Sequence, residues 1–550
     1  MAVKERTPLI HSQSSSSATI VIEDGENYGS LSKTLEEGQS KDDWEPHLGN
    51  ISLTMIADAN ASLSTGAFLA ALDTSIVVTI FNEIGTEFQS SNLSVWIMTS
   101  YMLSTSAVQP LYGKLSDIYG RKTTLVTIVC FFLLGSLLCG AAGSMVQLSI
   151  ARAIAGLGGG GIMTMASVVI HDLVPMRQRG QYQAYVNMAQ TIGTTVGAPL
   201  GGMINDTLGW RYCFYINIPF CLFILYCYVY RLENYNLDKK QEPASLGQID
   251  MVGALLLLMA NVCFVTSTSL GGNTHAWNNP WIVLLLVSAA ALFVGFGLYE
   301  FYGATSPLIS RTLIKNRNVM AVCLNNFFLS QSTMTMSYLI PQYFMGVLGY
   351  NPSSAGLWVF PRSILVAFGC YYSGRRLGVT GYYKHFVQTV MSCHVLIALG
   401  IYMWQPGQPL WYYLLCMNGE GFIFGLTFVA TMVALVADIQ HHETASATSM
   451  IFLFRSTGWL SGSTISAALM QSSFKSILYQ SIQGPEAADL IEFVRSSITK
   501  IRTLAPEMQV IVLGALQKSI HTALLFAVVT SVLSWTFTFG LRNCQLKNVK

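Results

Sequence analysis

The sequence predicts an all-α polytopic membrane protein, and composition and hydropathy are the two observations behind this prediction. Hydrophobic residues make up 52% of the 550 residues and charged residues only 11%, whereas soluble domains carry roughly 25% charged residues. The apolar residues form runs close to the about 20 residues that a helix needs to span a bilayer. A net charge of +2 gives no bulk attraction to nucleic acid, so we expect no nucleic-acid partner.

Fourteen apolar runs of this kind follow one another, and we expect one transmembrane helix from each. They cover residues 63–82, 95–112, 123–141, 147–170, 183–203, 212–231, 250–269, 281–300, 319–341, 354–372, 385–404, 410–436, 447–470 and 519–540. The first six would form a bundle over 63–231 and the last six a bundle over 319–540. Two inserted helices and cytosolic loops would occupy 232–318, with a long luminal loop over 471–518 and a cytosolic tail over 541–550.

The N-terminal segment 1–62 is polar, serine-rich and acidic, a composition that cannot bury enough apolar surface to fold alone. We therefore expect a disordered cytosolic tail. Glu5, Leu9 and Ile10 fit an acidic dileucine pattern, and Tyr28 to Leu31 fit a tyrosine-type sorting signal, although such short patterns also arise by chance. An adaptor complex that reads them would direct the protein to a vacuolar, lysosome-like membrane.

Basic residues predict the orientation, because cytosolic loops carry an excess of lysine and arginine. With the N-terminus inside, the cytosolic loops hold Lys114, Arg121, Lys122, Arg177, Arg179, Arg231, Lys239, Lys240, Arg311, Lys315, Arg317, Arg375, Arg376 and Lys384. The opposite short loops hold only Arg211. Both termini are therefore expected in the cytosol. Asn92 and Asn205 match the glycosylation pattern and are expected on the luminal side, close to the membrane.

The stretch GKLSDIYGRK lies between the second and third runs and contains Gly113, Asp117, Gly120, Arg121 and Lys122. The glycines permit a sharp turn and close backbone approach. Asp117 is expected to cap a helix or to pair with a cation. The stretch resembles the cytosolic gating loop between the second and third helices of major facilitator superfamily transporters.

A weaker copy of this pattern follows the tenth run. In GRRLGVTGYYK, Gly374, Gly378 and Gly381 fall at the offsets of Gly113, Asp117 and Gly120. Two related halves, each with its own copy, are a feature of the major facilitator fold. The repeat therefore supports the division into two six-helix bundles.

Asp73 and Arg152 are charged residues inside apolar runs. Asp73 lies about 15 Å along its helix, near the bilayer centre, where a carboxylate costs roughly 2.5–3.5 kcal/mol on insertion scales. It would carry a proton, meet a cationic substrate, or only fix the packing. The surrounding residues resemble the first-helix motif of 14-span drug:proton antiporters. Arg152 and Gly156 resemble a fourth-helix pattern implicated in proton transfer, where Arg152 would tune a carboxylate or bond backbone carbonyls.

The fifth run contains small residues on one helix face. Gly193, Gly197 and Gly201 recur every four residues, a spacing that lets helices approach closely. Pro199 is expected to loosen the helix locally, and Gly202 completes a stretch that resembles the antiporter motif of exporters. The resemblance is incomplete, because Ala198 shifts Pro199 one place later than in that motif.

Three further charged residues lie in the second half. Glu420 matches no family pattern and would favour a cationic substrate if it is buried, or would lie at the luminal end if its helix starts later. Arg455 resembles a recurring, structural arginine of the thirteenth helix. Arg362 follows Pro361, and we expect it at the luminal membrane interface.

The sequence predicts no enzyme activity, cofactor or metal site. The 11 cysteines are scattered without a CxxC pair, and the loop His441, His442 and Glu443 lacks metal-ligand spacing. Gly156 to Gly161 match GxGxxG, but they lie in an apolar helix rather than after a strand, so nucleotide binding is not expected. Because no Walker-type phosphate loop is present, the proton gradient is the expected energy source.

The resemblance covers residues 63–540 and implies a 14-span major facilitator of the drug:proton antiporter branch, most like the fungal vacuolar basic amino acid transporters. It implies a monomer that exchanges protons for lysine, arginine or histidine and moves them from cytosol to vacuole by alternating access. A plasma-membrane exporter of cationic drugs and a nutrient receptor on a transporter fold are the alternatives.

Overall fold

The computed structural model describes residues 53–88, 95–174, 176–232, 250–271, 275–304, 307, 309–350, 352–437, 439, 443–482 and 505–542. The sorting residues Glu5, Leu9 and Ile10, the glycosylation candidate Asn92, and the loop residues His441 and His442 lie outside these ranges. So do the second sorting pattern at residues 28–31 and most of the C-terminal tail.

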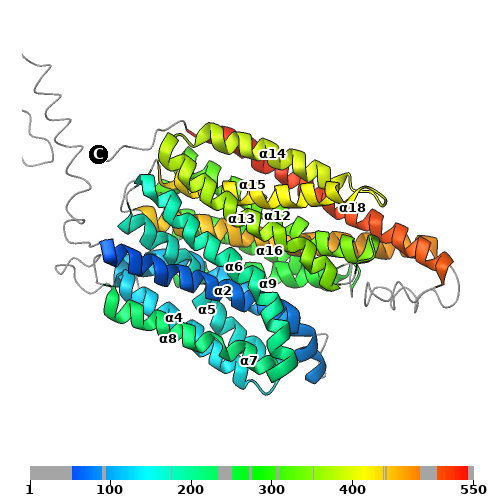
Figure 1. Cartoon of the computed structure of the whole chain (residues 1–550), viewed down its shortest axis with the longest axis horizontal. Coiled ribbons are helices and arrows are strands. Elements are labelled where there is room, and N and C mark those ends of the chain that lie inside the picture. Colours follow the sequence, from blue (N-terminus) through cyan, green and yellow to red (C-terminus); the bar gives the residue numbers. More distant parts are fainter. Residues whose placement is uncertain are drawn as a thin grey trace, which may run out of the picture. The chain divides into compact units, whose positions relative to one another are not determined.

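The described residues are almost entirely helical (Figure 1). The first group of helices is α2 (Leu53–Glu87), α3 (Val95–Tyr119), α4 (Arg121–Ala141), α5 (Met145–Leu173), α6 (Met176–Leu208), and the consecutive α7 (Trp210–Tyr215), α8 (Asn217–Tyr226) and η2 (Cys227–Arg231). The middle group is α9 (Met251–Leu270), α10 (Pro280–Leu298) with η4 (Tyr299–Gly303), and the short α11 (Arg311–Lys315). The last group is α12 (Arg317–Gln342) with η5 (Tyr343–Val347), α13 (Pro352–Thr380), α14 (Lys384–Tyr402), α15 (Leu410–Val436), α16 (Thr444–Ser481), and α18 (Pro506–Phe537) with η8 (Thr538–Gly540).

Each predicted apolar run coincides with one of these helical segments, although run 250–269 begins one residue before α9 and run 385–404 ends two residues after α14, and several helices are longer than predicted. The tail predicted over 1–62 is wrong at its end, because α2 begins at Leu53 and Asp58 in its first turns pairs with Arg231 at 2.6 Å. The luminal loop predicted over 471–518 is also too long, because α16 continues to Ser481 and α18 begins at Pro506. Hydropathy detects the part of a helix that matches the bilayer core, not the polar turns beyond it.

Seven helical segments of the described residues are long and apolar enough to cross a membrane by length and composition alone. The others, such as α12, contain polar residues that face protein rather than lipid. Asn325, Asn326 and Gln331 of α12 are all buried. Polar residues inside a helix bundle lower the mean hydropathy of a spanning helix without exposing it to lipid. The full number of spans therefore stays a prediction.

The helices pack in two groups (Figure 1). In the N bundle, defined as α2 to η2, α2 packs on α6 while α3 and α4 pack on α5. In the C bundle, defined as α12 to η8, α12 packs on α16 and α18, α13 packs on α15, and α14 packs on α15 and α18. The bundles meet through α6 with α13 and α3 with α16, and α9 contacts both α3 and α16.

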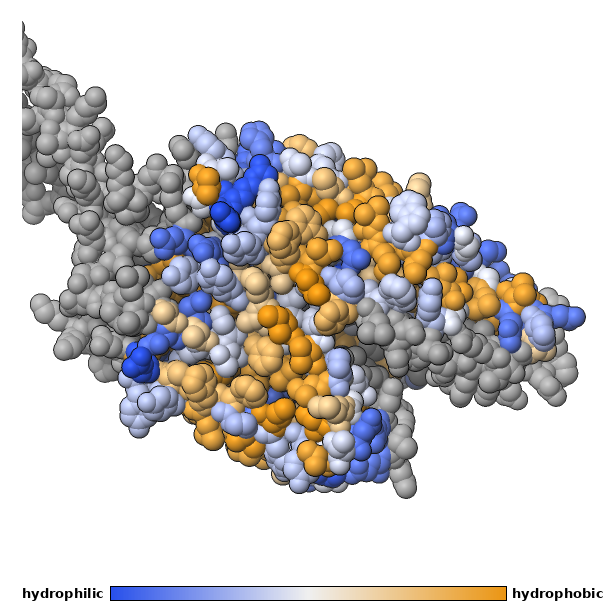
Figure 2. Space-filling model, in the orientation of Figure 1, coloured by the Kyte–Doolittle hydropathy of each residue, from blue (hydrophilic) through white to orange (hydrophobic). Residues whose placement is uncertain are grey.

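The surface of the bundles suits a lipid environment. Figure 2 shows hydrophobic residues across the middle of one face, with hydrophilic residues gathered toward its edges. Large exposed hydrophobic side chains include Leu222, Phe223, Trp281, Val287 and Leu396. An exposed apolar area of this extent is unfavourable in water and is expected for helices that contact lipid.

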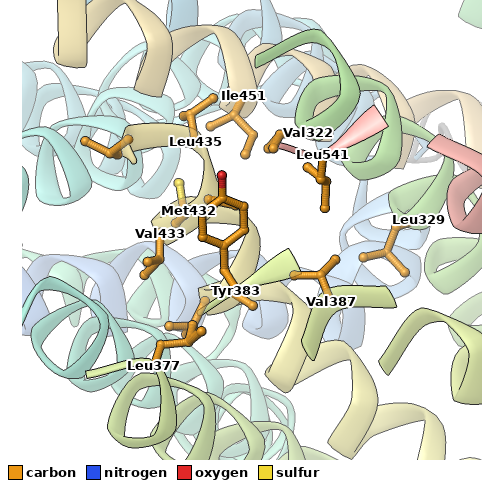
Figure 3. Packing of buried hydrophobic residues seen from close by; sticks show 14 of the residues in the cluster. Val322, Leu329, Leu377, Tyr383, Val387, Met432, Val433, Leu435, Ile451 and Leu541 are labelled. Atoms are coloured by element: carbon orange, nitrogen blue, oxygen red, sulfur yellow. The ribbon is translucent and has the colours of Figure 1, made fainter. Parts of the chain in front are cut away.

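An apolar cluster closes one end of the C bundle. Figure 3 shows the Tyr383 ring among Leu377, Val387, Met432 and Leu435, side chains that come from α13, α14 and α15. Leu541 and, from the N bundle, Ala184 of α6 join the same cluster. The packing therefore fixes the C bundle near the α13–α14 connection and holds α6 against it.

Candidate functional site

The connection between α3 and α4 is shorter than the sequence indicated. Residues Gly113 to Tyr119 continue α3 as a helix, so the prediction of a turn across the whole stretch is wrong. Gly120 alone links the helices, with φ of 86°. A side chain would strain this left-handed conformation, which explains a glycine here. Gly381, between α13 and α14, has φ of 69°, so the two repeat copies share this conformation.

At this connection Arg121, at the start of α4, bonds to residues near the ends of α3 and α5. Its Nη1 donates to Ser116 Oγ at 2.5 Å and to Asp117 Oδ1 at 2.6 Å, and its Nε donates to Asp172 Oδ2 at 2.7 Å. Asp117 thus pairs with a cation rather than capping a helix. Lys122 donates to the carbonyl oxygen of Val229 at 2.7 Å. Asp172 of α5 was not predicted, although a carboxylate at the end of an apolar run is a recognisable signal.

We call the end of the helices that carries Gly120 and Gly381 the basic end. Here the N and C bundles are in direct contact. A Cβ atom on Gly113 would lie 2.9 Å from the carbonyl oxygen of Ala445 in α16, and one on Gly180 would lie 3.2 Å from Gly374 Cα in α13. Glycine at these positions permits near-backbone contact, so the two bundles touch at the basic end.

Asp73 and Arg152 form a buried ion pair within the N bundle. Each is 1% exposed, and Arg152 Nη1 donates to Asp73 Oδ2 at 2.6 Å. Asn217 Nδ2 donates to the other carboxylate oxygen at 2.9 Å. Arg152 also donates to the carbonyl oxygen of Ile97 at 3.3 Å, and its guanidinium carbon lies 4.3 Å from the centre of the Tyr101 ring. Hydrogen bonds to both carboxylate oxygens offset the cost of burying the charges.

The glycines of α6 bring this helix against α2 next to the ion pair. A Cβ atom on Gly197 would lie 2.8 Å from the carbonyl oxygen of Leu72, and one on Gly201 would lie 2.8 Å from Thr79 Oγ1. Gly193 likewise faces Ala71. Ser75 Oγ donates to the carbonyl oxygen of Thr194 at 2.6 Å across the same contact.

One other prediction for α6 needs correction. Gly202 faces open space, with no atom within 4 Å of a Cβ placed on it, so it is not a packing residue. It lies one residue past Gly201 and therefore points about 100° around the helix. Pro199, which we expect to loosen the helix locally, lies inside α6, and the helix continues to Leu208. Asn205 lies in the last turns of α6, where its amide donates to Glu83.

Glu420 and Arg362 form a second ion pair, which the sequence did not indicate. Glu420 is fully buried within α15, and Arg362 Nε donates to its Oε2 at 2.6 Å. Arg362 Nη2 donates to Ser337 Oγ at 3.2 Å. The predictions of an interfacial Arg362 and of a Glu420 carboxylate facing the substrate are therefore both wrong in this structure. The two residues are 58 positions apart, and the contact of α13 with α15 brings them together.

Arg455 is buried and bonds to neutral groups. It donates to Asn326 Oδ1 at 2.7 Å, to the carbonyl oxygen of Phe428 at 2.9 Å and to Thr431 Oγ1 at 3.0 Å. Its guanidinium carbon also lies 3.9 Å from the centre of the Phe428 ring. These contacts join α12, α15 and α16, the arrangement expected of a structural arginine.

The bundles enclose a cavity, which we call the central cavity. It has a volume of about 560 Å³, including its opening, and lies between α6, α13, α15 and α16. Its lining residues are Asn187, Gln190, Thr191, Thr194, Arg362, Ser363, Val366, Cys370, Phe424, Phe428 and Trp459. A second cavity of about 1150 Å³ is lined by residues of α3, α9, α12 and α16 and by Gly271. Asp73 lines neither cavity.

Comparison with known proteins gives one family and several relatives. The family model of the Major Facilitator Superfamily matches residues 63–463. The multidrug resistance protein fnx1 of Schizosaccharomyces pombe is 33% identical, over 88% of this chain and 92% of that protein. The vacuolar membrane amino acid uptake transporter fnx2 of the same organism is 31% identical, over 90% and 86%. The vacuolar basic amino acid transporter 1 of Saccharomyces cerevisiae is 30% identical, over 79% and 81%.

A solved structure shares the fold. The human organic anion transporter MFSD10 (TETRAN) superimposes with a TM-score of 0.57 at 14% identity, and the match covers 87% of this chain and 99% of that one. At this level of identity the likeness concerns the arrangement of helices alone. The sequence prediction of a major facilitator fold is therefore confirmed.

Proposed function

Because the chain belongs to the major facilitator superfamily, we propose that it is a proton-coupled antiporter that moves basic amino acids from the cytosol into a vacuole. Two relatives support this substrate and membrane, since their names describe vacuolar amino acid uptake and vacuolar basic amino acid transport. The observation that carries the coupling step is the buried Asp73–Arg152 pair, because a paired carboxylate inside a membrane is a group that can exchange a proton.

The contacts between bundles support a direction of access. The bundles touch at the basic end through Gly180 and Gly374, and the central cavity lies beyond that contact, between later residues of α6 and earlier residues of α13. Cytosolic loops carry the excess of lysine and arginine. The basic end is then the cytosolic end, both termini are cytosolic, and this conformation admits solutes from the lumen.

A cycle follows from these positions. In the lumen-facing state, Asp73 accepts a proton from the acidic lumen, and its bonds to Arg152 and Asn217 weaken because the carboxylate loses its charge. The rearranged α2 packs differently against the glycine face of α6, and the basic end opens. Asp73 then releases the proton to the cytosol, and a basic amino acid from the cytosol binds in the central cavity. When the bundles rock back, the amino acid is carried to the lumen.

Sorting to the vacuolar membrane would use the N-terminal segment, where Glu5, Leu9 and Ile10 fit the signal that an adaptor complex binds. The protein would act as a monomer, since each chain holds its own cavity between two bundles. Glycosylation of Asn92 and Asn205 on the luminal side stays a prediction.

Uptake of labelled lysine by vacuolar vesicles tests this function. Vesicles from cells that make the protein should accumulate lysine in the presence of ATP, and an uncoupler should abolish the accumulation. Vesicles from cells that lack it provide the baseline. A nutrient receptor would give no uptake above that baseline.

The similarity to fnx1 favours a second candidate, a multidrug exporter in the plasma membrane. Localisation of a tagged protein separates the two. Location of the tagged protein in the vacuolar membrane, together with lysine uptake, supports the amino acid transporter. Location of the tagged protein in the plasma membrane, together with proton-dependent efflux of a cationic dye and no lysine transport, supports the exporter instead.

A further inference from the structure

Arg362 places a positive charge at the wall of the central cavity. Among the described residues that line the two cavities, it is the one that carries a formal charge. Its side chain is 15% exposed, whereas that of Glu420 is 0% exposed. The carboxylate thus lies behind the guanidinium, and a solute in the cavity meets the cation first.

Close packing of α13 on α15 produces this arrangement. A Cβ atom on Gly421 would lie 2.8 Å from the carbonyl oxygen of Arg362, and one on Gly425 would lie 3.0 Å from the backbone nitrogen of Cys370. Because two glycines let the helices approach, Arg362 Nε reaches Glu420 at 2.6 Å and Nη2 reaches Ser337 at 3.2 Å. Glu420 of α15 and Ser337 of α12 thus hold the guanidinium together.

The guanidinium of Arg362 has N–H groups that are not used by Glu420 or Ser337. An arginine side chain has five N–H donors, and Glu420 and Ser337 each accept one bond from Arg362. A planar guanidinium matches the geometry of a carboxylate through parallel N–H bonds. In a partly buried site such charge-assisted bonds are stronger than bonds between neutral groups.

We propose that Arg362 binds the carboxylate of the transported amino acid and that Glu420 is a positioning residue that holds the guanidinium in place. The proposal rests on the proposed function and names how its substrate is recognised. Without a substrate, Glu420 balances the charge of Arg362. With a substrate, the free N–H groups of Arg362 bind the carboxylate at the cavity wall.

The other described residues that line the cavity can bind a cationic side chain, although none of them is acidic. Gln190, Thr191 and Thr194 supply amide and hydroxyl oxygens, and the aromatic residues Phe424 and Trp459 line the cavity as well. Aromatic faces attract ammonium and guanidinium groups. A cation that lacks a carboxylate would meet Arg362 with no compensating bond.

Lysine and cadaverine test the carboxylate site, because cadaverine is lysine without its carboxyl group. Vesicles that contain the purified full chain are loaded with unlabelled lysine, and the counterflow of labelled lysine is measured against each competitor. We expect lysine to compete at least about tenfold better than cadaverine, the ratio that a charge-assisted bond provides. Arginine and agmatine form a second pair with the same difference.

The test variant is Arg362→Gln combined with Glu420→Gln. The single change Arg362→Gln would leave a buried carboxylate without its partner and destabilise the chain strongly, whereas the double change removes both charges. We expect the double variant to fold, to keep a low level of counterflow, and to lose the preference for lysine over cadaverine. The control is Arg211→Gln, whose exposed arginine pairs with Glu87 outside the cavity and whose loss should leave the preference intact.

The outcomes distinguish a failure of the carboxylate site from a failure of the proposed function. If the unmodified chain transports lysine but cadaverine competes equally, or if the double variant keeps the preference, Arg362 is not the carboxylate site and the proposed function stands. If lysine is not transported at all, the proposed function fails and the carboxylate site falls with it.

Discussion

At the scale of single residues, the molecule is organised around buried charges held in pairs. Asp73 with Arg152 and Glu420 with Arg362 each join two helices of one bundle. A buried pair adds little net stability because desolvation offsets the attraction, but loss of one partner leaves a charge that nothing balances. These pairs therefore constrain which substitutions the chain tolerates.

Removing Arg152 should destabilise the protein far more than removing Arg211. Arg152→Gln leaves Asp73 buried and without its cation, which costs about 3–5 kcal/mol. Arg211→Gln removes an exposed pair with Glu87, worth at most about 1 kcal/mol. Thermal unfolding in detergent, followed by size-exclusion chromatography after heating, measures the difference. Equal melting temperatures for the two variants would show that the buried pair does not constrain the fold.

The sequence identified charged residues well but not their partners. Asp73, Arg152 and Glu420 are recognisable because an isolated charge in an apolar run is costly. The link from Arg362 to Glu420 depends on how far α13 and α15 approach, which no local pattern encodes. The contacts of Asp172 with Arg121 and of Asn217 with Asp73 likewise depend on how the helices pack, although Arg121 and Asp73 themselves were predicted.

At the scale of elements, glycine sets the distance between helices. Gly193, Gly197 and Gly201 of α6 contact α2. Gly113 contacts α16, and Gly421 and Gly425 contact α13. The regular spacing of Gly193, Gly197 and Gly201 predicted their shared face, whereas Gly202, next to that face in sequence, points away from it. Helix ends were harder to predict, because Leu53 and Pro506 begin helices whose first turns are not apolar enough to be counted as membrane spans.

A valine at position 197 should disrupt the contact between α2 and α6, and a valine at position 202 should not. Gly197→Val places methyl groups against the Leu72 carbonyl and Ser75, so the helices must separate at a cost of about 1–3 kcal/mol. Gly202→Val extends into open space. Melting temperatures of the purified variants distinguish them, and a Gly197→Val protein as stable as Gly202→Val would contradict the predicted packing role.

At the scale of the whole molecule, two bundles meet at the basic end and leave a cavity beyond it. This arrangement is one of the two end states that the proposed alternating-access cycle requires. The apolar runs and the repeated glycine pattern predicted two bundles and a membrane-spanning fold. Which end is closed depends on contacts between bundles, such as Gly180 with Gly374, that appear only once the helices are packed.

A bulky residue at position 180 should open the basic end. Gly180→Leu crowds Gly374 and Val433, whose nearest atoms lie 3.2 and 3.4 Å from a Cβ at this position, so we expect the population to shift toward the cytosol-facing state. In a cysteine-free background, a Thr191→Cys reporter in the central cavity should then react several-fold faster with a thiol reagent added from the cytosolic side. Gly514→Leu, which points into open space on α18, is the control. Unchanged labelling would mean that this contact does not close the cavity.

The measurement that tests the central claim most directly compares driven uptake with exchange in the Asp73→Asn variant. Asparagine keeps the size of the side chain and one oxygen that can accept the bond from Arg152, but it cannot take up a proton. We predict that Asp73→Asn vesicles lose lysine accumulation driven by a proton gradient and keep lysine–lysine exchange without a gradient. Full gradient-driven accumulation in this variant would contradict the assignment of proton coupling to Asp73.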